Sequence, residues 1–115
     1  MIQAYTLTDL GNSGAFSFAD GINDAGQVVG YSVGVSVAVY ATLWSGGAAI
    51  NLGGLSGNNG GVAEAINDLG QVAGDSYFIG GGVVATLWSG GVATDLGVLT
   101  GFTNSFADGI NDAGP

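Results

Sequence analysis

The strongest constraint on the fold of this chain is an internal repeat with a spacing of 44 residues. Residues 21–30 read GINDAGQVVG, and residues 65–74 read AINDLGQVAG. The same pattern begins again at Gly109. A second motif, ATLWSGG, occupies residues 41–47 and returns at residues 85–91. Repetition at a fixed period of this length is typical of repeat proteins, in which each period folds into one small supersecondary unit.

Each period contains four segments that favour short β-strands. Because β-branched and aromatic residues fill them and Gly, Asn, Asp and Ser separate them, we expect an all-β meander. No segment has a helical period, and the 24 glycines disfavour a long helix. The predicted strands of the first repeat are Ala15–Ile22, Gln27–Ser32, Val37–Trp44 and Ala48–Leu52. Those of the second repeat are Gly61–Ile66, Gln71–Phe78, Val83–Trp88 and Val92–Leu96.

The connections between these strands carry turn signals of their own. Asn23–Gly26 and Asn67–Gly70 predict a type I turn followed by a glycine with positive φ, a common hairpin connection. Ser45–Gly47 and Ser89–Gly91 predict tight turns between the third and fourth strands. Gly53–Gly60 is then the link between the two repeats.

The two ends of the chain are out of phase with the repeats. Tyr5–Gly11 resembles the last strand of a repeat, and Phe106–Ile110 resembles a first strand. We therefore divide the single repeat domain into four parts. These are residues 1–13 (the last strand of a preceding repeat), 14–57 (repeat 1), 58–101 (repeat 2) and 102–115 (the start of a truncated third repeat).

The size of the repeat indicates an architecture. Four antiparallel strands in roughly 40–50 residues is the period of a β-propeller blade. Propellers typically contain about four to eight blades, so two complete repeats cannot close a ring alone. We expect that the chain belongs to a longer protein or that copies associate, because open sheet edges favour pairing. A β-solenoid is the alternative, since it also uses short strands separated by glycine.

The charge balance excludes several classes of function. The chain has nine carboxylates and no Lys, Arg or His, so each acid must be solvated, hydrogen-bonded or bound to a cation. The missing bases argue against binding to nucleic acid and to anionic membranes. There is no Cys for a disulfide, and no segment has the pattern of a signal peptide or a membrane-spanning helix. If the protein is exported, we expect the signal to lie outside this chain.

Acidic residues recur at two positions of the repeat. One lies two residues before, and the other two residues after, the isoleucine found in all three copies of the pattern. Residues two apart on a strand point to the same face, so these oxygens form a candidate calcium site together with Asn side chains and turn carbonyls. The alternative is that they are exposed turn residues and solvated strand ends, and the spacing is not that of an EF-hand. The candidate ligands are Asp20, Asp24, Glu64, Asp68, Asp108 and Asp112.

The two tryptophans also allow two interpretations. Trp44 and Trp88 each end an alternating strand, and tyrosines lie nearby in sequence. Aromatic rings beside carboxylates are typical of carbohydrate-binding surfaces, so both rings are candidates for stacking on a sugar. The favoured alternative is that they are the large pieces of the core between repeats, where an aromatic ring buries the most area.

Catalysis has little support in the residue types present. Without His and Cys there is no Ser-His-Asp or Cys-His arrangement, and without Lys there is no Schiff base or P-loop. Gly80–Gly82 has no phosphate-binding pattern. Paired carboxylates can hydrolyse glycosides, but each repeat carries equivalent acids and that reaction uses one asymmetric pair. We expect a protein that is not an enzyme.

Three motifs in order resemble the HAF-type extracellular repeats of bacteria. They are the Ile-Asn-Asp-x-Gly-Gln-Val block, the Ala-Thr-Leu-Trp-Ser-Gly-Gly block and Leu52–Leu55, and they cover almost the whole chain. The usual His-Ala-Phe-Leu-Trp segment reads here as residues 40–44, YATLW, and residues 84–88, VATLW. The resemblance implies secretion or surface display and a propeller-like fold, with no established catalytic activity.

These observations lead to two hypotheses about function. The first is an extracellular structural module that self-associates through its terminal strands into a closed homo-oligomer or a fibre. The second is a module that binds carbohydrate, calcium or both. Calcium is the one cofactor that either hypothesis includes.

Overall fold

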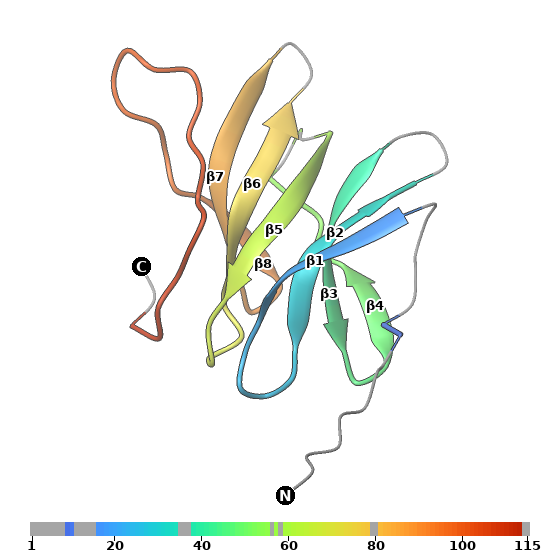
Figure 1. The fold of residues 1–115 in the computed structure, drawn as a ribbon. Coiled ribbons are helices and arrows are strands. Elements are labelled where there is room, and N and C mark those ends of the chain that lie inside the picture. Colours follow the sequence, from blue (N-terminus) through green and yellow to red (C-terminus); the bar gives the residue numbers. More distant parts are fainter. Residues whose placement is uncertain are drawn as a thin grey trace, which may run out of the picture.

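The computed structural model describes residues 9–10, 16–34, 38–55, 57, 59–78 and 81–113. Within these residues the fold is all-β, with two four-stranded antiparallel sheets (Figure 1). The same residues contain no helix with the length and hydropathy needed to span a membrane. Sheet 1 consists of β1 (Phe16–Ile22), β2 (Val28–Val33), β3 (Val39–Ser45) and β4 (Ala48–Asn51). Sheet 2 consists of β5 (Gly60–Ile66), β6 (Val72–Phe78), β7 (Gly82–Ser89) and β8 (Val92–Asp95).

Each sheet is a meander built from one repeat. The strand orders are β1-β2-β3-β4 and β5-β6-β7-β8, and every neighbouring pair is antiparallel. All eight predicted strands in the two repeats are confirmed, with ends that differ by one or two residues. Because strands pair within a repeat, the described sheets have the layout of a blade. A solenoid would instead join the strands of successive coils into one sheet.

The predicted strand at Phe106–Ile110 is wrong. This segment is extended but forms no ladder within the described part of the chain, and the single bridge nearby is a parallel one between Asn104 and Val83. A strand needs a neighbour for its backbone hydrogen bonds, and the described residues supply none here. The strand predicted within Tyr5–Gly11 lies outside the described residues except for Asp9 and Leu10, which are not in a strand.

The predicted turns are confirmed by their backbone angles. Gly26 and Gly70 both have φ of 80°, and each donates its N–H to the carbonyl of the Asn three residues earlier (3.1 Å in both turns). The Gly-Gly pairs between the third and fourth strands have positive φ at both positions, as a two-residue type I′ hairpin requires. The turns therefore come directly from local sequence.

Both first strands carry a β-bulge at an acidic residue. The pairing register shifts between Ala19 and Gly21 in β1, and at the equivalent place in β5, so Asp20 and Glu64 are the extra residues. Opposite the bulge, a Cβ on Gly30 would lie 1.9 Å from the carbonyl oxygen of Phe18. Glycine at this position therefore allows the first two strands to approach closely.

The core lies between the two sheets. Alternation along the strands places Val29, Ala41 and Leu43 on one side of sheet 1, which we call its forward face. In sheet 2 the side that corresponds to this forward face carries Ala73 and Leu87, and the other side, its rear face, carries Val72 and Trp88. Val72 and Trp88 pack against the forward face of sheet 1. Strand β5 is the part of sheet 2 that lies against β1, β2 and β3 (Figure 1). Sheet 2 thus stacks on sheet 1, with the rear face of sheet 2 against the forward face of sheet 1.

A buried pair of hydroxyl groups joins two strands on the rear face of each sheet. The Thr42 hydroxyl donates to the carbonyl of Tyr40 (2.8 Å) and lies 2.9 Å from the Ser32 hydroxyl, which therefore donates to it. Ser76 and Thr86 repeat this pair in sheet 2 at 2.7 Å. All four hydroxyl groups are satisfied, so they can be buried without a large desolvation penalty.

Candidate functional site

Three consecutive turns are stacked at one end of the molecule by the side chains of their Asn residues. The Asn23 side-chain carbonyl accepts a hydrogen bond from the Gln27 N–H (2.9 Å), and its amide donates to the Asn67 carbonyl (3.0 Å). The second turn repeats this, since Asn67 accepts from the Gln71 N–H (2.9 Å) and donates to the Asn111 carbonyl (2.9 Å). Each Asn therefore shapes its own turn and binds the next repeat.

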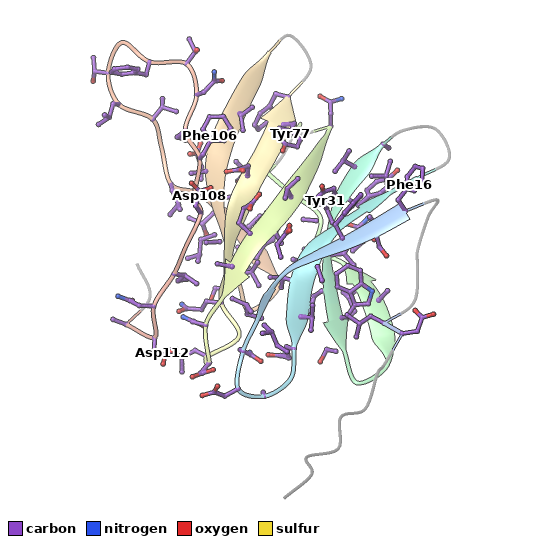
Figure 2. The ribbon with its side chains drawn as sticks, viewed as in Figure 1. Phe16, Tyr31, Tyr77, Phe106, Asp108 and Asp112 are labelled. Atoms are coloured by element: carbon purple, nitrogen blue, oxygen red, sulfur yellow. The ribbon has the colours of Figure 1, made fainter. Side chains whose placement is uncertain are left out.

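The Asp after each Asn takes part in a second hydrogen bond between neighbouring turns. We call the Asn and Asp residues of the three turns, with these bonds, the turn ladder. The Asp24 N–H donates to Oδ1 of Asp68 (2.8 Å), and the Asp68 N–H donates to Oδ1 of Asp112 (2.9 Å). The stacking brings like charges together. The pKa of Asp24 is raised by its hydrogen bond to the Asp68 carboxyl group and by repulsion from that group. Figure 2 shows Asp112 at this turn end of the molecule.

The turn ladder includes three of the proposed calcium ligands and gives the carboxylates of two of them a structural role. Asp68 and Asp112 accept backbone hydrogen bonds from the preceding repeat, and Asp24 occupies the first position of the same row. In the part of the chain that the structure describes, no group of three or more His, Cys, Asp or Glu side chains is placed to hold a metal ion. These residues therefore do not form a ligand set that supports the prediction of calcium binding.

The other three proposed calcium ligands belong to the first strands and their equivalent. Asp20 and Glu64 are the bulge residues of β1 and β5, and Asp108 follows 44 residues after Glu64. Burial raises the pKa of Asp20 and of Glu64. Glu64 also feels repulsion from Asp20, Asp75 and Asp108, so these four carboxylates share one region. A bulge turns its side chain out of the regular alternation, which brings the acids of successive repeats together.

Asp75 is a functional candidate that the sequence analysis missed. It lies on β6, is 4% exposed, and accepts a hydrogen bond from the Ala107 N–H (3.0 Å). Burial raises its pKa, the hydrogen bond from Ala107 lowers it, and repulsion from Asp108 raises it. The signal in the sequence was a break in the repeat, because the equivalent residue 44 positions earlier is Tyr31.

Aromatic side chains border this group of acids. Tyr31 stacks on Phe18 with ring centroids 4.8 Å apart. The pKa of Tyr77 is raised by burial and then by the negative charges of Asp75 and Glu64. Figure 2 shows Tyr31 and Tyr77 away from the turn end, toward Phe16 and Phe106. We call this region the acid–tyrosine surface, and its members are Phe18, Asp20, Tyr31, Glu64, Asp75, Tyr77 and Asp108.

The two tryptophans are in the interior. Trp44 and Trp88 are each 3% exposed, so neither ring face is open to a sugar in this structure. Trp88 belongs to the core between the sheets. Among the described residues, their Nε1 atoms are the buried side-chain polar atoms without a hydrogen-bond partner. This placement favours the interpretation of both rings as core residues.

The forward face of sheet 2 is covered differently from that of sheet 1. Residues 104–111 cross it in the place that β5 takes on sheet 1: the Ser105 N–H donates to the Val83 carbonyl (2.8 Å), and the Ala85 N–H donates to the Ser105 hydroxyl (2.8 Å). A cavity of about 500 Å³ remains beside this segment. Its lining is mostly apolar and consists of Ala73, Leu87, Leu96, Ala107, Gly109, Ile110 and Asn111.

Comparison with known proteins gives no family or relative for this chain. No protein-family model matches it, and neither does any curated protein or solved structure.

Proposed function

We propose that this chain is a structural repeat module that self-associates by stacking another copy on sheet 2, to form a closed propeller-like oligomer or a fibre. One contrast supports the proposal. The forward face of sheet 1 is packed against Val72 and Trp88 of sheet 2. The equivalent face of sheet 2 meets only residues 104–111 among the described residues and keeps an apolar cavity beside them.

The loop after β8 extends this apolar surface. Leu96 is 45% exposed, although its equivalent Leu52 packs against the core between the sheets. Leu99 and Phe102 are 75% and 66% exposed in the same loop. Contiguous exposed apolar side chains on a small protein mark a contact surface, because single scattered ones would need no explanation.

The charge of the chain restricts how such an assembly forms. With nine acids and no basic side chain, no interface between copies can use side-chain salt bridges. Apolar burial and backbone hydrogen bonds must therefore drive association against the repulsion between copies. We expect association to strengthen with added salt, which screens that repulsion.

A location outside the cell and the absence of catalysis complete the proposal. The resemblance to HAF-type repeats favours secretion or surface display, and that family has no established activity. The lack of His, Cys and Lys removes the imidazole and amine bases and the thiol nucleophile, which is consistent with a structural role.

Light scattering across a range of protein concentrations tests the proposal. We expect the mean mass to rise with concentration, and Leu96→Asp to suppress the rise because it places a charge beside the cavity. Leu69→Asp is the matched control, since Leu69 is 70% exposed in a turn and does not line the cavity. A constant monomer mass at high concentration and high salt contradicts the proposal.

The second candidate function is binding of carbohydrate, with or without calcium, at the acid–tyrosine surface. Its support is the stacked Phe18–Tyr31 pair beside the carboxylates of Asp20 and Glu64. We expect Tyr31→Ala to abolish any glycan binding and Glu64→Gln to abolish any rise in melting temperature with Ca²⁺. Tyr40→Ala is the control, because Tyr40 lies on β3 outside this surface. No response to a glycan panel or to EDTA eliminates this function.

A further inference from the structure

The segment that crosses sheet 2 is a copy of β1, not of β5. Residues 17–25 and residues 105–113 have the same sequence, SFADGINDA, although a complete repeat separates them. The equivalent residues 61–69 of the second repeat read GVAEAINDL. The C-terminal segment therefore carries the β1 side chains that pair with β2 from Ser17 to Ile22, and Asn104 stands in the place of Phe16.

This segment is held on sheet 2 but has no partner strand in the described residues. Asp75 accepts its Ala107 N–H, and Asn67 and Asp68 bind Asn111 and Asp112 through the turn ladder. The two turn-ladder contacts reproduce the way in which the turn of β5 is bound to the turn of β1. The segment is not in a strand, but it occupies the position that the first strand of a third sheet would take.

We propose that residues 105–113 of one copy replace β1 in a second copy, so that sheet 1 of the second copy stacks on sheet 2 of the first by strand exchange. This inference rests on the proposed self-association and specifies its interface. In the exchanged state Phe106 pairs with Tyr31 of the second copy, in the register that Phe18 has within one chain. The displaced β1 is an edge strand with Phe16, Phe18 and Ile22 exposed.

The free energy of the exchange favours assembly for a simple reason. Because residues 105–110 are identical to residues 17–22, the backbone bonds and the ring contact that β1 loses from Ser17 onward are formed again by the segment. The gain comes from the forward face of sheet 2, which receives the rear face of the second copy's sheet 1. That rear face carries Val28 and Trp44, the equivalents of the Val72 and Trp88 that fill the same place inside one chain. Val28 and Trp44 are already buried in the single chain, so the newly buried apolar area lies on the side of sheet 2. Apolar surface beside the cavity is thereby removed from water.

One pair of glycines distinguishes the exchanged state from the single chain. A Cβ on Gly21 would lie 3.3 Å from the Ala65 Cα and from the Glu64 carbonyl oxygen. A Cβ on Gly109 would meet nothing within 4 Å. After exchange, Gly109 takes the place of Gly21 and faces Ala65 of the second copy. A side chain at position 109 is therefore harmless in one chain and obstructive in the assembly.

The first test is Gly109→Val, with Gly21→Val as its matched control. We expect Gly109→Val to leave the melting temperature of the dilute protein unchanged and to raise the concentration at half-assembly by about tenfold or more, as overpacking of an interface predicts. Gly21→Val introduces the obstruction within one chain, so we expect it to lower the melting temperature. Unchanged assembly of Gly109→Val overturns the exchange.

The second test is a disulfide between copies. Because the chain has no cysteine of its own, only the introduced cysteines can form a disulfide. We expect the double variant Phe106→Cys/Tyr31→Cys to form covalent multimers under mild oxidation, with residues 106 and 31 joined in the peptide map. Phe18→Cys/Tyr31→Cys should form its disulfide within one chain, since those residues are register partners. The double variant Phe106→Cys/Leu69→Cys is the control, because it measures how much cross-linking random collision produces.

The outcomes separate this inference from the proposed function. Cross-linking of Phe106→Cys/Tyr31→Cys no greater than that of Phe106→Cys/Leu69→Cys overturns the exchange, even if light scattering shows assembly by another surface. A monomer at all concentrations overturns both the exchange and the proposed function.

Discussion

Sheet 1 and sheet 2 have closely similar sequences and the same strand order, but they have different neighbours. The forward face of sheet 1 is packed against a complete second sheet, and Leu52 is partly buried there. The forward face of sheet 2 is crossed by one extended segment, and the equivalent Leu96 is exposed. The comparison shows that burial of the forward face is set by the repeat that follows it, because a sheet cannot cover that face with its own residues.

The largest effect that this comparison predicts concerns the two tryptophans. Trp88 lies in the core between the sheets, so Trp88→Ala should cost about 3–5 kcal/mol and leave little folded protein. Trp44→Ala should cost less, because Trp44 is on the rear face of sheet 1 and outside that core cluster. Urea unfolding followed by circular dichroism measures both. Equal losses would show that the core between the sheets does not dominate stability.

The turn ladder provides the next effect. Asn67→Ala removes the bond to the Asn111 carbonyl and the acceptor for the Leu69 and Gln71 N–H groups, and should cost about 2 kcal/mol. Asn111→Ala should cost less than about 0.5 kcal/mol, since Asn111 is exposed. Thermal melts of the two variants compare them. A similar cost at both positions would contradict the role of the ladder in joining repeats.

A smaller effect is expected where Asp75 holds the C-terminal segment. Asp75→Ala removes the acceptor for the Ala107 N–H and should cost about 1 kcal/mol, with faster hydrogen exchange at Ala107. Asp75→Asn keeps a side-chain carbonyl and should preserve protection of that amide. Loss of protection in both variants would mean that the carboxylate charge, not its acceptor geometry, holds the segment.

The smallest effect is a dependence of stability on pH. The pKa values of Asp20, Glu64 and Asp75 are raised in the folded state, so the folded chain binds protons more tightly than the unfolded chain. Stability therefore falls as pH rises from the ordinary values of 3.8 for Asp and 4.5 for Glu through the raised folded values. We expect a higher melting temperature at about pH 5 than at pH 7, because repulsion among the nine acids acts in the same direction.

A matched pair of variants assigns this pH dependence. Asp75→Asn should reduce the difference between the two melting temperatures, because it removes a buried carboxylate. Asp95→Asn removes the same formal charge from an exposed strand end and should reduce the difference less. A melting temperature that rises from pH 5 to pH 7 would contradict the predicted sign.

Much of the fold was predictable because its signals are local. The Gly26 and Gly70 turns follow from Asn-Asp-x-Gly, and the alternation of apolar residues defines the strands between them. The predicted strand at Phe106–Ile110 was wrong for a physical reason: it has the residues of β1, but a ladder also requires a second strand. Local sequence cannot supply that neighbour.

The candidate site was harder to predict. The recurrence of Asp24, Asp68 and Asp112 was visible, but the use of Asp68 and Asp112 as acceptors for the preceding repeat depends on how the turns stack. The role of Asp75 also depends on stacking, because its partner Ala107 lies in the following repeat. The available signal for Asp75 was a departure from the repeat, because Asp75 stands where the first repeat has Tyr31.

The sequence by itself determined the period, the turns, the strands and the excess of negative charge, since each depends on residues close together in the chain. Tertiary structure alone decided that the acids of the turns join repeats, that the tryptophans are buried and that sheet 2 keeps an apolar face. These properties depend on which repeat lies beside which. Contacts of that kind form between residues 44 positions apart, and no local pattern specifies them.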